Sequence, residues 1–333
     1  MLSLILFVPF LTLHFSTALN GPLSADFQQW LTTNGYANDD FVRLDYGSQG
    51  SYGGRTEQAK KVLHSPVVFI HGNSDAALYI SKSASGWTNS IQYFLDKGYT
   101  EAELYATSWG DTNTSNAGKR THNCVVLQRL RRFVQAVLAY TGAANVSLVT
   151  HSMGVTLGRK LIKGGVVDGS DGSCNLGTPM TSKVDIFLGL AGANFGLCSC
   201  EGSGVLVPTC NKKNGFWPGD TCGLNSYTCG LSPLTFPCSS PTYSQILTSM
   251  NTDGVREAST VYSAWSKADE LILYGDEVWG RPTSLIPTSI GQVVYKSYTH
   301  MQTKENTAAD QYTMVALKIL PSSNSYQAST LVV

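Results

Sequence analysis

The fold of this chain is decided by the run Val146-Ser147-Leu148-Val149-Thr150-His151-Ser152-Met153-Gly154. Its first five residues have the composition of a short buried strand, and a helix is expected to follow over residues 153–163. Ser152 therefore stands on a sharp strand-to-helix turn, a nucleophile elbow, which exposes its hydroxyl. Gly154 is suitably small, whereas the β-branched side chain of Thr150 must find room. The run predicts a nucleophilic serine.

Strand and helix patterns alternate on both sides of this elbow. The expected strands are 67–70, 104–107, 184–190, 260–264, 270–273 and 293–298, and the further helices are 85–97, 123–140 and 308–320. Such alternation predicts an α/β fold, with a mostly parallel sheet covered by helices on both faces. Ligands bind at the carboxyl ends of the strands in such sheets, where the elbow falls. Arg129, Arg131 and Arg132 are expected on the solvated side of their helix.

A serine nucleophile needs a base, usually a histidine that a carboxylate orients. For an elbow serine the chain order is serine, acid, histidine. Of the six histidines, only His300 follows Ser152, so it is the expected base. The acid should follow a strand. Asp269, one loop beyond a predicted strand, is the preferred acid, and Asp276 and Glu277 are its rivals.

A second turn, early in the chain, is expected to complete the site. It follows the predicted strand at 67–70 and contains Gly72, which lets the backbone turn. The main-chain N–H groups of Asn73 and Met153 are the expected oxyanion hole, since both follow strands that end at the same edge. The neighbouring histidines at 71 and 151 are expected to pack and to form hydrogen bonds.

Composition excludes several classes of protein. The chain has 333 residues, of which 42% are hydrophobic and only 14% charged, with 23 basic and 23 acidic side chains. These values exclude disorder and coiled coil, and zero net charge gives no reason to expect nucleic acid as a partner. No apolar run reaches the ~18–20 residues of a membrane span.

An export signal is expected at the N-terminus. Residues 2–15 are largely apolar, and Ser16-Thr17-Ala18 supplies small residues for cleavage near Ala18, so 1–18 is a predicted signal peptide and 19–333 a single mature domain. A buried N-terminal strand is the alternative. Asn113 and Asn145 begin glycosylation triplets. The protein is predicted to be secreted and extracellular.

Eight cysteines follow the predicted signal, and six of them fall between residues 198 and 238. They are Cys124, Cys174, Cys198, Cys200, Cys210, Cys222, Cys229 and Cys238. An even number in an exported chain predicts disulfides, whose pairing the sequence leaves open. Zinc fingers need C-x-x-C pairs, which do not occur, so no metal is expected.

The segment from about 197 to 240 is expected to be an insertion beside the site. It is rich in Gly, Cys, Pro and Ser, with scattered apolar residues that include Phe216 and Trp217. A loop of this length is usually functional or cross-linked. It is either a disulfide-braced lid or lipid-contact surface, with Phe216 and Trp217 at its tip, or a device that stabilises the protein.

A family resemblance joins these motifs. F-I-H-G-N, V-T-H-S-M-G, L-A-G-A-N, Y-S-A-W-S-K-A-D-E-L-I and the final T-H, spread over about residues 66–320, resemble the class 2 lipases, which are compact α/β-hydrolases. The resemblance implies Ser152, Asp269 and His300 as the triad, Asn73 and Met153 as the oxyanion hole, and no cofactor.

The expected function is that of a secreted serine esterase that hydrolyses lipid esters through an acyl-enzyme, without a cofactor and with its oligomeric state left open. A non-catalytic lipid carrier on the same fold is one alternative, and an acyltransferase or peptide-directed enzyme is another, since fold alone does not fix function. Head group and chain length are also left open.

Overall fold

A computed structural model describes residues 19–201, 206–219, 229–230, 241–322 and 326–331. The predicted signal peptide, 1–18, lies outside the described residues, as do Cys222 and Cys238. No helix in the described part of the chain is both long enough and apolar enough to cross a membrane.

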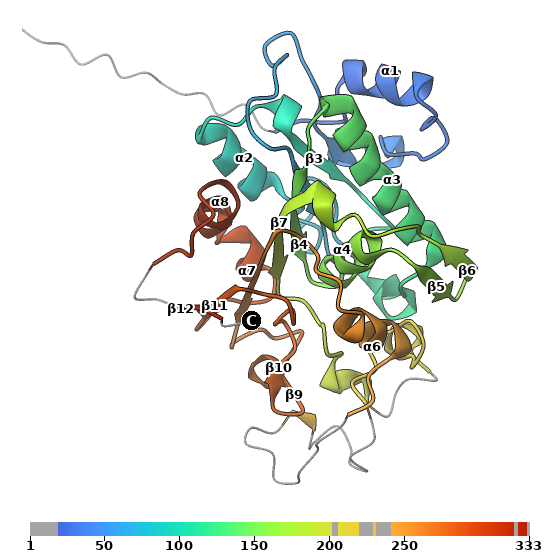
Figure 1. The fold of residues 1–333 in the computed structure, drawn as a ribbon, viewed down its shortest axis with the longest axis vertical. Coiled ribbons are helices and arrows are strands. Elements are labelled where there is room, and N and C mark those ends of the chain that lie inside the picture. The colour runs from blue at the N-terminus through green and yellow to red at the C-terminus, as the bar shows by residue number, and fades with distance from the viewer. Residues whose placement is uncertain (1–18, 202–205, 220–228, 231–240, 323–325, 332–333) are drawn as a thin grey trace, which may run out of the picture.

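The centre of the described structure is an eight-stranded sheet in the order β1-β3-β2-β4-β7-β8-β11-β12 (Figure 1). Its strands are β1 (Ser51–Tyr52), β2 (Val67–Ile70), β3 (Leu104–Thr107), β4 (Val146–His151), β7 (Val184–Leu190), β8 (Thr260–Ser266), β11 (Gly291–Tyr295) and β12 (Tyr326–Thr330). The pairs from β3 through β2, β4, β7 and β8 to β11 are all parallel, whereas β1 and β12 run antiparallel at the two edges. The predicted mostly parallel sheet is confirmed.

Helices cover both faces of this sheet, as predicted. They are α1 (Ala25–Thr33), α2 (Thr88–Asp96), α3 (Cys124–Thr141), α4 (Met153–Lys163), α6 (Gln245–Thr252), α7 (Gln302–Glu305) and α8 (Ala308–Ala316). The alternation of side chains along β2 shows the two layers: Val68 and Ile70 join the core under α1, α3, α4 and α6, whereas Val67 and Phe69 join the core under α2 and α8. Figure 1 shows α2 and α8 on one side of the sheet and α3 and α4 on the other.

Two small two-stranded ribbons lie outside the main sheet. One pairs β5 (Val166–Gly169) with β6 (Gly172–Asn175), and the other pairs β9 (Glu277–Val278) with β10 (Arg281–Pro282).

Several expected boundaries are wrong. Residues 270–273, predicted as a strand, form a turn, because a carboxylate oxygen of Asp269 accepts the main-chain N–H groups of Leu271 and Ile272 and folds the backbone back. The last helix ends at Ala316, five residues before the proline expected to stop it, and the next residues include Lys318 with a positive φ of 58°.

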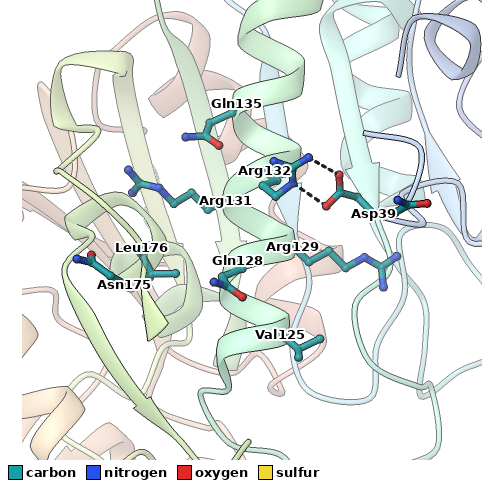
Figure 2. A pocket seen from close by; sticks show the side chains of 10 residues that line it. Asp39, Val125, Gln128, Arg129, Arg131, Arg132, Gln135, Asn175 and Leu176 are labelled. Carbon is teal, nitrogen blue, oxygen red and sulfur yellow. Dashed lines mark hydrogen bonds and ion pairs between the residues drawn. The ribbon is translucent and has the colours of Figure 1, made fainter. Parts of the chain in front are cut away.

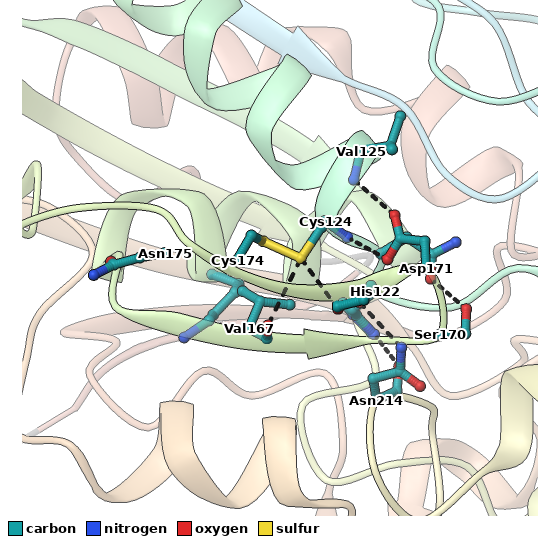
Figure 3. Close-up of a disulfide and its surroundings, with 12 residues drawn as sticks. His122, Cys124, Val125, Val167, Ser170, Asp171, Cys174, Asn175 and Asn214 are labelled. Atoms are coloured by element: carbon teal, nitrogen blue, oxygen red, sulfur yellow. Dashed lines mark hydrogen bonds between the residues drawn. A yellow bond between two sulfur atoms is a disulfide. The ribbon is translucent and has the colours of Figure 1, made fainter.

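Three disulfides join described cysteines, as the even cysteine count predicts. The bond between Cys124 and Cys174 ties the start of α3 to the β5–β6 ribbon (Figure 3). Asp171 in that ribbon caps the same helix end, since its carboxylate accepts the N–H groups of Cys124 and Val125 at 2.9 Å each. The ribbon thus holds α3 by a covalent bond and by a helix cap.

The other two disulfides, Cys198–Cys229 and Cys200–Cys210, brace the described part of the insertion. Phe216 and Trp217, predicted at an exposed tip, are instead buried at 4% and 6% exposure. The amino group of Lys212 lies 4.5 Å from the centre of the Trp217 ring, and the Phe216 ring packs edge-on against His122. These aromatic side chains are therefore part of the packed structure.

We expect the Cys124–Cys174 bond to stabilise the fold more than the Cys200–Cys210 bond. The first spans 50 residues of chain and the second 10, so loop entropy predicts a difference of about 1.4 kcal/mol. Urea unfolding of the two paired Cys→Ala variants measures it. Equal losses, or a larger loss for the short loop, would contradict this expectation.

Candidate active site

Ser152 lies between β4 and α4 with φ 56° and ψ −130°, a backbone conformation that residues other than glycine rarely adopt. The strand–turn–helix context predicted for it is therefore present. Two residues on, Gly154 lets α4 approach β2, because a Cβ there would lie 2.5 Å from the carbonyl oxygens of Ile70 and His71. Room for the branched Thr150 comes from Gly158, whose missing Cβ would lie 3.0 Å from its methyl group.

The structure brings Asp269 and His300 together. The Nδ1–H of His300 donates to one carboxylate oxygen of Asp269 at 2.7 Å. The other oxygen accepts the N–H groups of Leu271 and Ile272 at 2.9 and 2.8 Å, which fixes the carboxylate at the end of β8. Both partners of the pair are only 4% exposed. The arrangement holds the imidazole in one tautomer, with Nε2 left to exchange protons.

Ser152 and His300 line the same cavity, of about 430 Å³, with no hydrogen bond between them among the described residues. The cavity opens at the carboxyl ends of β2, β4, β8 and β11, where the alternation pattern predicts a site. Apolar side chains dominate its wall: Ala193, Leu197, Phe216, Leu271, Ile272 and Met301.

The two other histidines near the serine are buried and neutral. Burial lowers the pKa of His71 to about 4, against the charge of Asp75. The ring of His71 donates from Nδ1 to the Gly72 carbonyl at 2.7 Å and accepts the Trp109 N–H at Nε2, 2.9 Å away. Burial likewise holds the pKa of His151 well below its usual range, and His151 Nε2 lies 3.1 Å from the His300 carbonyl oxygen. Both rings therefore fix main-chain groups.

Asn73 and Met153 also line the cavity. Met153 is the first residue of α4, so its N–H is one of the unpaired donors at the positive end of the helix. The hydrogen bonds of the described residues give no acceptor to the main-chain N–H of either Asn73 or Met153. Both N–H groups thus belong to residues that line the cavity and have no acceptor among the described residues.

Sequence reasoning missed a buried ion pair beside the site. Lys304, 1% exposed, donates to Asp75 at 2.5 Å and to Ser85 at 3.0 Å. Burial is the largest influence and would raise the pKa of Asp75, but the charge of Lys304, the His71 ring and the hydrogen bonds from Lys304 and the Gly86 N–H together outweigh it, so that pKa is lowered. Asp75 lies in the turn after β2 and Lys304 four residues beyond His300, so no local pattern connects them. The only hint of this ion pair in the sequence is that the turn containing Gly72 also carries an acidic residue, Asp75.

The two rival acids, Asp276 and Glu277, do not line the cavity at Ser152. Asp276 is fully buried and bonded to Ser284, and Glu277 begins β9. Of the two aromatic residues expected at a lid tip, Phe216 lines the cavity and Trp217 does not.

The arginine face of α3 carries another cavity, of about 480 Å³, which shares no lining residue with the one at Ser152 (Figure 2). Arg132 forms a two-bond ion pair with Asp39 there, at 2.7 and 2.8 Å. Arg131, expected on the solvated side, is buried and donates to two main-chain carbonyls. These side chains hold α3 to its neighbours. The described residues contain no cluster of three side chains suited to a metal ion.

Comparison with known proteins supplies the family. The sequence model of the class 2 lipases matches residues 64–313. Solved structures with similar folds include lipase B from Aspergillus fumigatus (11% identity, TM-score 0.44), the lipase BlEst2 from Bacillus licheniformis in its propeptide form (14%, 0.46) and the carboxylesterase CesB from Bacillus subtilis (11%, 0.43).

The matches cover 78%, 82% and 82% of this chain, and 54%, 54% and 90% of those chains. This chain thus spans about half the length of the first two. The family assignment rests on the match of the sequence model, which extends over most of the chain. The chain belongs to the class 2 lipase family, and its mostly parallel sheet, with helices on both faces, is that of an α/β-hydrolase.

Proposed function

We propose that this protein is a secreted serine hydrolase that cleaves lipid esters through Ser152, with Asp269 and His300 as the other members of its triad. The observation that carries the proposal is the convergence of a serine on a strained elbow and a buried Asp–His pair on one apolar cavity. The disulfides support export, as do the predicted leader and the glycosylation triplets.

The reaction begins with attack by the Ser152 hydroxyl on the ester carbonyl. His300 Nε2 takes the hydroxyl proton, and Asp269 stabilises the imidazolium through its bond to Nδ1. The N–H groups of Asn73 and Met153 receive the carbonyl oxygen as it becomes negative. His300 then gives its proton to the departing alcohol, which leaves an acyl-enzyme.

Hydrolysis of the acyl-enzyme repeats these steps with water. His300 takes a proton from the water, the hydroxide attacks the acyl carbonyl, and the proton returns to Ser152 as the acid departs. The cavity wall, with Leu197, Phe216 and Ile272 among its side chains, supports an ester with an apolar acyl chain as the substrate. No described feature favours a carrier or an acyltransferase over this reaction.

Ser152→Ala should abolish ester hydrolysis while the protein stays folded and secreted. A residual rate of about 10³–10⁴-fold over water is compatible with loss of the nucleophile, because the oxyanion hole and binding remain. Initial rates with a dissolved short-chain ester, and labelling by a fluorophosphonate, provide the measurement. A variant that still turns over or labels near the wild-type rate would remove Ser152 from the mechanism.

Asp269→Asn should lower kcat by about 10⁴-fold, because an amide no longer selects the correct histidine tautomer. Asp276→Asn is the matched control, since it makes the same acid-to-amide change in another buried carboxylate. It should keep nearly full activity. Steady-state kinetics on the two purified variants decides, and an inactive Asp276→Asn enzyme would transfer the role of acid to Asp276.

Asp276→Asn also carries an expectation for stability. Burial raises the pKa of Asp276 well above its usual range. Ser284 Oγ lies 2.6 Å from the carboxyl and 2.7 Å from the Gly192 carbonyl. The hydroxyl has one proton, and when it donates this proton to the Gly192 carbonyl, a protonated Asp276 donates its own proton to the Ser284 oxygen. A raised folded-state pKa means that the contribution of Asp276 to stability is full below about pH 4 and is lost as the pH rises through the folded-state pKa. The melting temperature should fall with pH more steeply in the wild type than in the asparagine variant, and parallel curves would contradict this.

Phe216→Ala should change the chain-length preference, because Phe216 lines the cavity and Trp217 does not. Trp217→Ala should lower the melting temperature, with long-chain and short-chain activity falling together. Rates on an ester series, dissolved and emulsified, together with thermal midpoints, distinguish the two roles. If Trp217→Ala instead selectively lowers activity on emulsified long-chain esters, the insertion acts as the lid considered from the sequence.

A further inference from the structure

Arg120 lies in the segment between β3 and α3, and its side chain bonds to the turn that carries Asn73. One terminal nitrogen of its guanidinium lies 2.5 Å from the Asn73 side-chain oxygen and 2.5 Å from the Ser74 hydroxyl. The other terminal nitrogen donates to the carbonyls of Asp111 and Asn113 at 2.9 and 3.1 Å, and pairs with the Asp111 carboxylate. The Arg120 side chain is only 10% exposed. It is therefore anchored at one end and bound to the turn at the other.

The turn needs this anchor because it is strained. Ser74 has a φ of 63°, in the left-handed region that a residue with a side chain keeps only where the surroundings impose it. The Ser74 hydroxyl also donates to the Asn73 side chain at 3.1 Å. The Asn73 amide nitrogen in turn donates to the Ala117 carbonyl at 3.0 Å. Every polar atom of the Asn73 side chain is thus bound to this turn or to the segment that carries Arg120.

The direction of the Asn73 main-chain N–H is sensitive to this arrangement, because the turn touches the serine. A Cβ on Gly72 would lie 2.7 Å from the Cβ of Ser152. On its far side the turn is fixed by the Asp75–Lys304 ion pair. Asn73 lies between the two attachments, so loss of Arg120 frees the part of the turn that carries the proposed oxyanion donor.

We propose that Arg120 is a positioning residue for ester hydrolysis, and that it directs the Asn73 N–H toward the cavity by holding the Asn73 side-chain oxygen. This inference rests on the proposed function. Arg120 does not touch the cavity itself, so it acts through Asn73. Removal of one oxyanion donor costs about 10²–10³-fold in kcat. A donor that is misdirected but still present should cost less than its removal, so we expect a fall of about 10–100-fold in kcat for Arg120→Met.

The expected signature is a change in kcat with KM within about threefold of wild type, because the oxyanion forms only in the transition state. A trifluoromethyl ketone substrate analogue, which forms such an oxyanion with the serine, should bind more weakly by the same factor as kcat/KM falls. Arg132→Met is the matched control. It makes the same change at an arginine on α3 whose partner is Asp39. It should leave both kcat and the affinity for the trifluoromethyl ketone unchanged.

A double-mutant cycle tests the route through Asn73. Asn73→Ala removes the oxygen that Arg120 holds but keeps the main-chain N–H, so it should cost as much as Arg120→Met. The double variant should lose less than threefold more than either single variant. Full kcat in Arg120→Met, additive losses, or a change in KM alone would overturn the proposal.

The remaining outcomes are also decisive. If Arg120→Met does not fold, Asn73→Ala alone must show the matched losses in kcat and inhibitor affinity, and full activity in that variant overturns the proposal. A wild-type protein that neither hydrolyses esters nor reacts with a fluorophosphonate refutes the proposed function itself. An active wild type with an unaffected Arg120→Met variant refutes only the role of Arg120.

Discussion

The close approach of α4 to the end of β2 is the constraint on which the rest of the site depends. It is possible only because Gly154 has no side chain, since a Cβ would collide with two main-chain carbonyls. The same approach holds Ser152 at a positive φ and brings it into contact with the turn at Gly72. Ser152 and the turn at Gly72 are therefore both set by backbone packing, which leaves little freedom to either.

The proposed base is placed by contacts with three separate segments. Asp269 fixes its ring, His151 approaches its carbonyl oxygen, and the helix that follows it is joined through Lys304 to Asp75. Because these partners come from different strand ends, the loop that carries His300 is correctly placed only when the sheet is assembled. The apolar wall, contributed partly by the disulfide-braced insertion, completes a cavity that no single segment forms.

Local patterns in the sequence predicted the parts of this structure that local physics determines. The buried strands, the helix over residues 153–163 and the order of Ser152, Asp269 and His300 follow from periodicity and motif spacing, and the structure places these three residues at one edge of the sheet. The sequence wrongly predicts a strand at 270–273 because the apolar residues there fit a strand pattern. The hydrogen bonds from the main chain to the Asp269 side chain, which fold this segment into a turn, have no such pattern. The roles of Lys304 and Arg120 have no local signal, since their partners lie far away in the chain.

The neutrality of the two buried histidines has a consequence for proton traffic. The ring of His151 is centred only 4.6 Å from that of His300, and His71 lies in the turn that touches Ser152. Low pKa values keep both rings uncharged at neutral pH, so a transient imidazolium at the proposed base His300 meets no positive charge from either ring. Neither of these two rings therefore competes with His300 for the proton that the proposed reaction moves between Ser152 and the substrate.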